Sequence, residues 1–68
     1  MEVGNLDNIG KKVKEERLKK RLKQYELANK AGISNTYLSD VEVGRTNPSI
    51  KTLDKLSKIL EVDIRKFL

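Results

Sequence analysis

Four short polar side chains in the middle of the chain have the types and the spacing to bind the edges of nucleic-acid bases. They are Asn35, Thr36, Ser39 and Asp40. In a helix, residues at i, i+1, i+4 and i+5 share one face. An asparagine can make two hydrogen bonds to adenine, hydroxyls can bond several bases, and a carboxylate can accept from the amino group of cytosine. The predicted chemistry is therefore recognition of base edges.

The same residues also fit a simpler interpretation. Short polar side chains are favoured at the start of any helix, so Asn35 and Thr36 do not by themselves require a ligand. Asp40 is ambiguous because the phosphates that line a DNA groove repel a carboxylate. It could instead pair with a neighbouring lysine or discriminate against wrong sequences. The residues alone leave both interpretations open.

A helix over residues 35–43 would hold these side chains. Leu38 and Val41 fall on its opposite face and would pack inward. Ser34 is a favourable N-cap because its hydroxyl can accept a hydrogen bond from the first turn. Gly44 would end the helix. The predicted helix therefore has an apolar back and a polar front.

Another helix is predicted over residues 24–31, and only a tight turn separates it from the helix over residues 35–43. Gly32 suits that turn because glycine takes a positive φ at little cost. Ala28 is small enough to let two helices cross closely. The residues that would join the two helices from inside are Leu27, Ala31, Ile33, Leu38 and Val41. This is the pattern of a helix-turn-helix, whose second helix enters the DNA major groove.

A flexible N-terminal leader is expected over residues 1–8. The first helix would follow over residues 9–21, with Asp7 or Asn8 as its cap. Its apolar stripe consists of Ile9, Val13, Leu18 and Leu22. This helix would complete the core around the helix-turn-helix.

The clearest loop is 45–47, because Pro48 disfavours a helical conformation in the residue before it. Ser49 would cap a fourth helix, with inward residues Ile50, Leu53, Leu56, Ile59 and Leu60. Asp63 would cap a short fifth helix, in which the core is closed by Ile64, Phe67 and Leu68. Nothing alternates with a period of two, so no sheet is expected. The predicted fold is one all-α domain of five helices over residues 9–68.

Composition excludes several classes of function. A chain of 68 residues buries only about 60% of its unfolded surface, so an enclosed active-site cleft is not expected. It has no Cys and no His, so thiolates, imidazole bases and the usual zinc ligands are absent. We therefore expect no enzyme, no metal and no cofactor. The start is unlike a signal peptide and no apolar run could span a membrane, which favours a cytoplasmic, nucleoid-associated protein without a membrane partner.

The net charge of +5 suits a polyanionic partner or simply a soluble surface. Basic residues are concentrated between Lys11 and Lys23, where Glu15 and Glu16 oppose them. The eight basic residues are Lys11, Lys12, Lys14, Arg17, Lys19, Lys20, Arg21 and Lys23. They form either a solvated helix face or an edge that faces phosphates.

The segments "QYELANKAGIS", "YLSDVEVGRTNPS" and "LSKILEVDIRKFL" are the most informative for a family. Over residues 9–68 the chain resembles the phage Cro- and repressor-type helix-turn-helix family, also called xenobiotic-response-element-like. The resemblance implies a five-helix, lambda-repressor-like domain. It also implies a homodimer that binds double-stranded operator DNA and regulates transcription as a repressor.

The resemblance assigns roles to particular residues. Those implied to read bases are Asn35, Thr36, Ser39 and Asp40. Those expected at the DNA backbone are Gln24, Lys23, Tyr37, Arg45, Thr46 and Asn47. The alternative for Gln24 is an exposed first-turn residue that satisfies free backbone amides. Tyr37 could equally cover the edge of the core. A buried ion pair between Arg17 and Glu42 is implied as a structural element, with a phosphate contact of Arg17 secondary.

The chain departs from the family at four positions. Lys23 replaces the usual polar cap of the second helix, and Val43 replaces a common asparagine. Arg21 and Glu61 stand where glycine is usual after the first and fourth helices. A non-glycine residue in a left-handed conformation costs about 1–2 kcal/mol. Either those turns differ, or the helices continue through them.

Three classes of function compete. The first is a sequence-specific transcription regulator. The second is a DNA-binding module that acts through a protein partner, such as an antitoxin, a restriction-modification controller or the head of a longer regulator. The third is an enzyme or a purely structural domain. A DNA reader should lose affinity steeply as salt rises, and no toxin-binding tail is recognisable before Leu68.

A two-fold dimer on a palindromic operator is the geometric expectation for such a motif. It would form through the last helix or only on DNA. The apolar candidates for the interface are Val62, Ile64, Phe67 and Leu68. The same residues could instead belong to the core.

Overall fold

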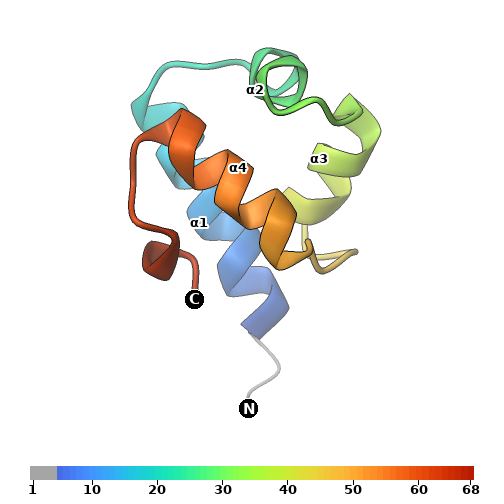
Figure 1. The fold of residues 1–68 in the computed structure, drawn as a ribbon. Helices are drawn as coiled ribbons and strands as arrows, with labels where there is room; N and C mark the ends of the chain where they lie inside the picture. Colours follow the sequence, from blue (N-terminus) through green and yellow to red (C-terminus); the bar gives the residue numbers. More distant parts are fainter. Residues whose placement is uncertain (1–4) are drawn as a thin grey trace.

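A computed structural model describes residues 5–68 of the chain, with side chains from residue 9 onward. The described part is helical and contains no strand (Figure 1). Its elements are α1 (Asn5–Lys19), α2 (Gln24–Ala31), α3 (Asn35–Glu42), α4 (Ile50–Leu60) and the 3-10 helix η1 (Ile64–Lys66). The predicted all-α class is confirmed.

The predicted fifth helix is a single 3-10 turn. Asp63 caps it, because its Oδ1 accepts a hydrogen bond from the Arg65 backbone N–H at 2.8 Å. Phe67 follows directly and is buried. The geometry of 3-10 hydrogen bonds is poor, so such helices stay short. The described residues thus form four α-helices and one short turn that brings Phe67 into the core.

The N-terminal boundary differs from the prediction. Residues 1–4 of the expected leader lie outside the described residues. Residues 5–8 belong to α1, so Asp7 and Asn8 are inside the helix rather than at its cap. The helix also ends earlier than expected, at Lys19.

Two non-glycine residues adopt the left-handed conformation for which glycine is usual. Arg21 has φ 59° and Glu61 has φ 61°. In each turn the next residue closes the helix end: the Leu22 N–H donates to the Arg17 carbonyl at 3.2 Å, and the Val62 N–H donates to the Ser57 carbonyl at 2.9 Å. These bonds satisfy carbonyls that a helix end leaves unpaired. The turns therefore keep the usual geometry, and the helices do not continue through them.

One apolar core joins all the elements. Its fully or nearly fully buried members are Val13, Leu27, Ala28, Ala31, Leu38, Val41, Leu53, Leu56, Leu60 and Phe67. Three predicted core residues are instead on the surface, since Leu18 is 55%, Ile50 is 63% and Leu68 is 66% exposed. Val13 and Arg17 set the inner face of α1, and Leu18 lies one residue further around the helix. Ile50 is the first residue of α4, and the first residue of this helix that is buried in the core is Leu53.

A glycine that the sequence did not single out allows α1 and α3 to approach closely. Gly10 is buried. A Cβ atom at Gly10 would lie 2.2 Å from the carbonyl oxygen of Val41 and 2.8 Å from that of Glu42. Both are backbone atoms, so they cannot move aside as a flexible side chain can. The close packing of α3 against α1 therefore depends on the absence of a side chain at Gly10.

Candidate nucleic-acid interface

The turn between α2 and α3 has the predicted local structure. Gly32 has φ 69°, and the Ile33 N–H donates to the Ala28 carbonyl at 3.0 Å. The Ser34 hydroxyl accepts from the Tyr37 N–H at 3.0 Å, as an N-cap should. Ala28 is almost fully buried. A tight turn therefore connects two short helices that pack on each other and on the rest of the core (Figure 1).

The outer face of α3 carries the residues predicted to read bases. Asn35 and Thr36 are exposed, whereas Ser39 and Asp40 are half-buried. Leu38 and Val41, on the opposite face, are buried. The structure thus presents these four polar side chains on one side of a helix whose other side is fixed by the core.

Asp40 pairs with an arginine rather than with a neighbouring lysine. The Arg45 Nη1 lies 3.1 Å from the Asp40 Oδ1. The Arg45 backbone N–H also donates to the Asp40 carbonyl at 2.8 Å. The first residues after α3 therefore fold back onto its last turn.

The ion pair predicted between Arg17 and Glu42 is present. The Arg17 Nε donates to the Glu42 Oε2 at 2.8 Å, and its Nη2 donates to Oε1 at 3.0 Å. The Arg17 Nη1 also donates to the Leu22 carbonyl at 2.9 Å. The two side chains are only 8% and 2% exposed. This bidentate pair ties α1 to the end of α3 and needs its hydrogen bonds, because buried charges are stable only when they are fully paired.

Gln24 joins this network instead of standing apart at the start of α2. Its Nε2 donates to the Glu42 Oε1 at 3.0 Å. A glutamine amide has two N–H donors and a carbonyl oxygen, so a second N–H and the oxygen remain for another partner. Gln24 is half-buried, and its predicted contact with a DNA phosphate would come from a side chain already held in place.

Lys23 is the N-cap of α2, and its side chain does not cap the helix. Instead, the Glu26 Oε1 accepts from the Lys23 backbone N–H at 2.7 Å. The glutamate also suits this end, where the helix dipole is positive. The exposed lysine side chain remains beside that positive end, where an incoming phosphate would compensate both charges.

The loop after α3 carries the other predicted backbone contacts. Arg45 and Asn47 are exposed, while Thr46 is half-buried. Pro48 is buried and precedes α4. The Ser49 hydroxyl caps α4 by accepting from the Thr52 N–H at 3.1 Å. Tyr37, on α3, is half-buried, which is compatible with both of its predicted roles.

A buried carboxylate at α1 was missed by sequence reasoning. Glu16 accepts a hydrogen bond from the Lys19 Nζ at 3.2 Å, and the Lys66 Nζ lies 3.6 Å from the same oxygen. Burial by itself would raise the pKa of Glu16, but the hydrogen bonds and charges of the two lysines hold it below its ordinary value. The spacing of Glu16 and Lys19 is visible in the sequence, whereas the approach of Lys66 depends on the fold.

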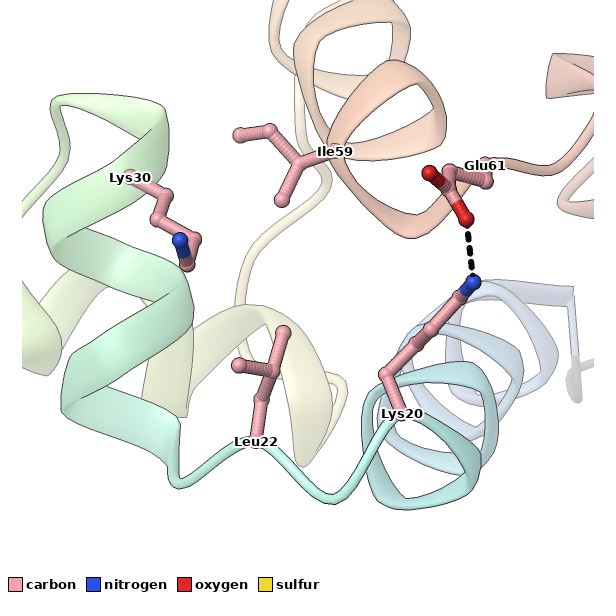
Figure 2. A pocket seen from close by; sticks show the side chains of 5 residues that line it. All are labelled: Lys20, Leu22, Lys30, Ile59 and Glu61. Atoms are coloured by element: carbon pink, nitrogen blue, oxygen red, sulfur yellow. Dashed lines mark hydrogen bonds and ion pairs between the residues drawn. The ribbon is translucent and has the colours of Figure 1, made fainter.

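A hollow of about 440 Å³ lies where the end of α1, α2 and the end of α4 meet (Figure 2). Its walls are formed by Lys20, Leu22, Lys30, Ile59 and Glu61. The Lys20 Nζ and the Glu61 Oε1 form an ion pair across one side, 2.5 Å apart. None of these wall residues belongs to the sets predicted to read bases or to bind the DNA backbone, and only Lys20 comes from the basic run between Lys11 and Lys23.

Two packed helices with a tight turn, a buried apolar back and an exposed polar front define a helix-turn-helix domain of the DNA-binding class. The chain belongs to the helix-turn-helix family, whose sequence profile matches residues 13–67. This is a family of DNA-binding transcription regulators and not of enzymes.

Relatives of known sequence and structure agree with this assignment. The chain is 45% identical over 56 residues to the ImmF control region 10 kDa protein of Bacillus phage phi105 (82% of this chain, 62% of that protein). It is 43% identical over 61 residues to the transcriptional regulator SinR of Bacillus subtilis (88% and 55%). The chain thus spans little more than half the length of these two relatives.

Solved structures of similar proteins share the fold. The restriction-modification controller protein C.AhdI of Aeromonas hydrophila superposes with a TM-score of 0.91 at 31% identity, covering 96% of this chain and 98% of that one. SinR in complex with DNA superposes with a TM-score of 0.81 at 42% identity, covering 87% and 95%. Within the described residues, moreover, every helix is too short or too polar to cross a membrane.

Proposed function

We propose that this protein is a sequence-specific regulator of transcription that binds double-stranded DNA and acts as a repressor. The observation that carries the proposal is the geometry of α3. Its apolar back is anchored in the core through Leu38 and Val41, and its front presents Asn35 and Thr36 to solvent. Such a helix can enter the major groove and bring short side chains to base edges.

In this proposal the contacts divide into two groups. Specificity comes from the front of α3, where Asn35, Thr36 and Ser39 read base edges and Asp40 lies on the same face beside Arg45. The phosphate backbone is bound from three places: the start of α2, Tyr37 on α3, and the loop after α3. The residues at the start of α2 are Lys23 and Gln24, and those in the loop are Arg45, Thr46 and Asn47. Phosphate contacts fix the register of a protein on DNA, while contacts to base edges read the sequence.

We further propose a homodimer on a palindromic operator. The burial of Phe67 assigns it to the core, whereas Leu68 is exposed and Val62 and Ile64 are half-buried. The proposed interface therefore uses Leu68 with the outer parts of Val62 and Ile64. Two copies related by a two-fold axis would read half-sites about 34–36 Å apart. This pairing forms either in solution or only on DNA.

A second candidate, the role of a restriction-modification controller, is favoured by one specific observation. The restriction-modification controller C.AhdI superposes with a TM-score of 0.91 at 31% identity. The similarity to ImmF and SinR supports a further alternative, the DNA-binding head of a longer regulator. In both cases the domain would bind DNA in the same way, in the cytoplasm at the nucleoid.

Selection from random-sequence duplex DNA tests the proposal. The protein should enrich a short palindromic site. The logarithm of its binding constant for that site should fall linearly with the logarithm of the salt concentration, with a slope of about −0.9 for each phosphate neutralised. The molecular mass of the protein in solution, measured with and without the selected duplex, then distinguishes a stable dimer from one that forms only on DNA. Failure to enrich any sequence at low salt would overturn the proposed function.

A further inference from the structure

Arg45 compensates the negative charge of Asp40 and of the C-terminal end of α3. Asp40 lies in the last turn, where the partial charge of the helix is negative, and that turn contains no basic residue. Arg45 supplies the missing positive charge from the following loop. It makes two bonds to the same residue, one from its backbone N–H at 2.8 Å and one from its Nη1 at 3.1 Å. The loop conformation and the side-chain pairing therefore support each other.

The two side chains of this pair differ in exposure. The Asp40 side chain is 34% exposed and the Arg45 side chain is 74% exposed. A guanidinium has five N–H donors in a rigid planar fork, and the recorded contact with Asp40 uses one of them. The carboxylate thus holds one edge of the guanidinium while most of the group faces solvent. Arg45 can bind a second anion without leaving the first.

We propose that Asp40 is a positioning residue, which holds the Arg45 guanidinium at the end of the base-reading face so that it binds one DNA phosphate in a fixed register. The inference rests on the proposed function and deepens it. Asp40 shares the face of α3 that carries Asn35, Thr36 and Ser39. A guanidinium fixed there couples the phosphate contact to the position of the helix in the groove.

Pairing also changes the balance between specific and nonspecific binding. The charges of Asp40 and Arg45 largely cancel at a distance, so the pair adds little to the general attraction for phosphates. Held in one geometry, Arg45 loses less conformational freedom when it binds the correct phosphate. Asp40 should therefore weaken binding to unrelated DNA and favour the operator.

Replacing Asp40 by asparagine removes the charge and keeps the shape. In Asp40→Asn, affinity for an unrelated duplex should rise about threefold, because one repulsive charge is removed. The ratio of operator affinity to unrelated-duplex affinity should fall about fivefold, the upper range for an exposed pair. Both affinities would be measured by fluorescence anisotropy on the selected operator and on a scrambled duplex of equal length.

Asp54→Asn is the matched control. Asp54 forms an exposed pair with Lys58 on α4, with 3.1 Å between Oδ2 and Nζ. The control removes the same charge and the same kind of ion pair outside the proposed interface. It should leave the affinity ratio unchanged, and thermal unfolding of both variants should show that each remains folded.

The Arg45→Gln background decides whether Asp40 acts through Arg45. In that background Asp40→Asn should no longer lower the affinity ratio, since the residue that it positions is gone. If the loss persists, Asp40 does not act through Arg45 and the proposal is wrong. A change of preference at one base pair would then show that Asp40 reads a base directly. An unchanged ratio in Asp40→Asn alone also overturns the proposal. Failure of the unaltered protein to select a sequence is a different result, because it is seen before any variant is compared.

Discussion

Arg17 and Glu42 form a bidentate, buried ion pair that joins α1 to the last residue of α3. The contacts are 2.8 Å from Nε to Oε2 and 3.0 Å from Nη2 to Oε1. The same carboxylate accepts from Gln24 at the start of α2. Through one side chain, therefore, the three helices that set the position of the base-reading face are connected.

Removing one partner of this pair should destabilise the domain severely. Glu42→Ala leaves the Arg17 guanidinium buried without a counter-charge, at an expected cost of about 3–5 kcal/mol in the free energy of unfolding. Urea titration followed by far-UV circular dichroism measures it. The exposed pair of Asp54 and Lys58 serves as control, since Lys58→Ala should cost less than about 1 kcal/mol. Equal effects of the two substitutions would contradict the structural role assigned to the buried pair.

Gly10→Ala should also destabilise, although alanine is ordinarily the better helix former. In an open helix position the change from glycine would stabilise by about 1 kcal/mol. Here the added methyl would meet the carbonyl oxygens of Val41 and Glu42, and forced overpacking costs about 1–3 kcal/mol. The melting temperature should therefore fall. Lys14→Ala, at an exposed position of α1, is the control and should change stability by less than about 0.5 kcal/mol.

The double substitution Asn35→Ala with Thr36→Ala tests the base-reading face. Each good contact to a base edge contributes about 1–3 kcal/mol of discrimination, so affinity for the selected operator should fall at least about tenfold. Affinity for unrelated DNA should hardly change, because the phosphate contacts remain. Asn29→Ala provides an exposed asparagine on α2 for comparison. If the double variant selects the same site as the unaltered protein, the recognition assignment is wrong.

The ion pair of Asp63 and Arg65 predicts a loss of stability in acid. Hydrogen bonds from the Arg65 side chain and backbone lower the pKa of Asp63 from 3.8 to about 2. A carboxylate with a lowered folded-state pKa stabilises the protein above its ordinary pKa, and this stabilisation is lost as the pH falls through the folded-state value. The contribution should thus disappear between about pH 4 and pH 2.

Asp63→Asn keeps the hydrogen-bond acceptor of the cap and removes the titrating charge. The difference in unfolding free energy between the unaltered protein and Asp63→Asn should be constant from pH 7 to pH 5 and should shrink as the pH approaches 2. Urea titrations at each pH measure it, and the lowered pKa values of Glu16 and Glu61 cancel in the comparison. A difference that does not depend on pH would show that the charge of Asp63 has no role.

The sequence by itself determined the features that depend on neighbouring residues. Gly32 and Ser34 mark the turn and the start of α3, and Ser49 marks the start of α4. These signals act within three or four residues through φ preference and capping, so they can be recognised without a fold. The alternation of buried and exposed residues along α3 follows from helical periodicity in the same way.

Tertiary structure alone decided which surfaces meet. The sequence suggested that Leu18 and Ile50 were core residues, but the rotation of α1 and the start of α4 leave them exposed. Gln24 bonds Glu42 across 18 positions, and the backbone contact at Gly10 requires two helices distant in sequence to cross there. Arg21 and Glu61 take positive φ because packing on both sides of each turn fixes the path of the chain, and that packing outweighs a local cost of about 1–2 kcal/mol. Propensity and periodicity describe one element at a time, whereas these choices depend on the summed contacts of several.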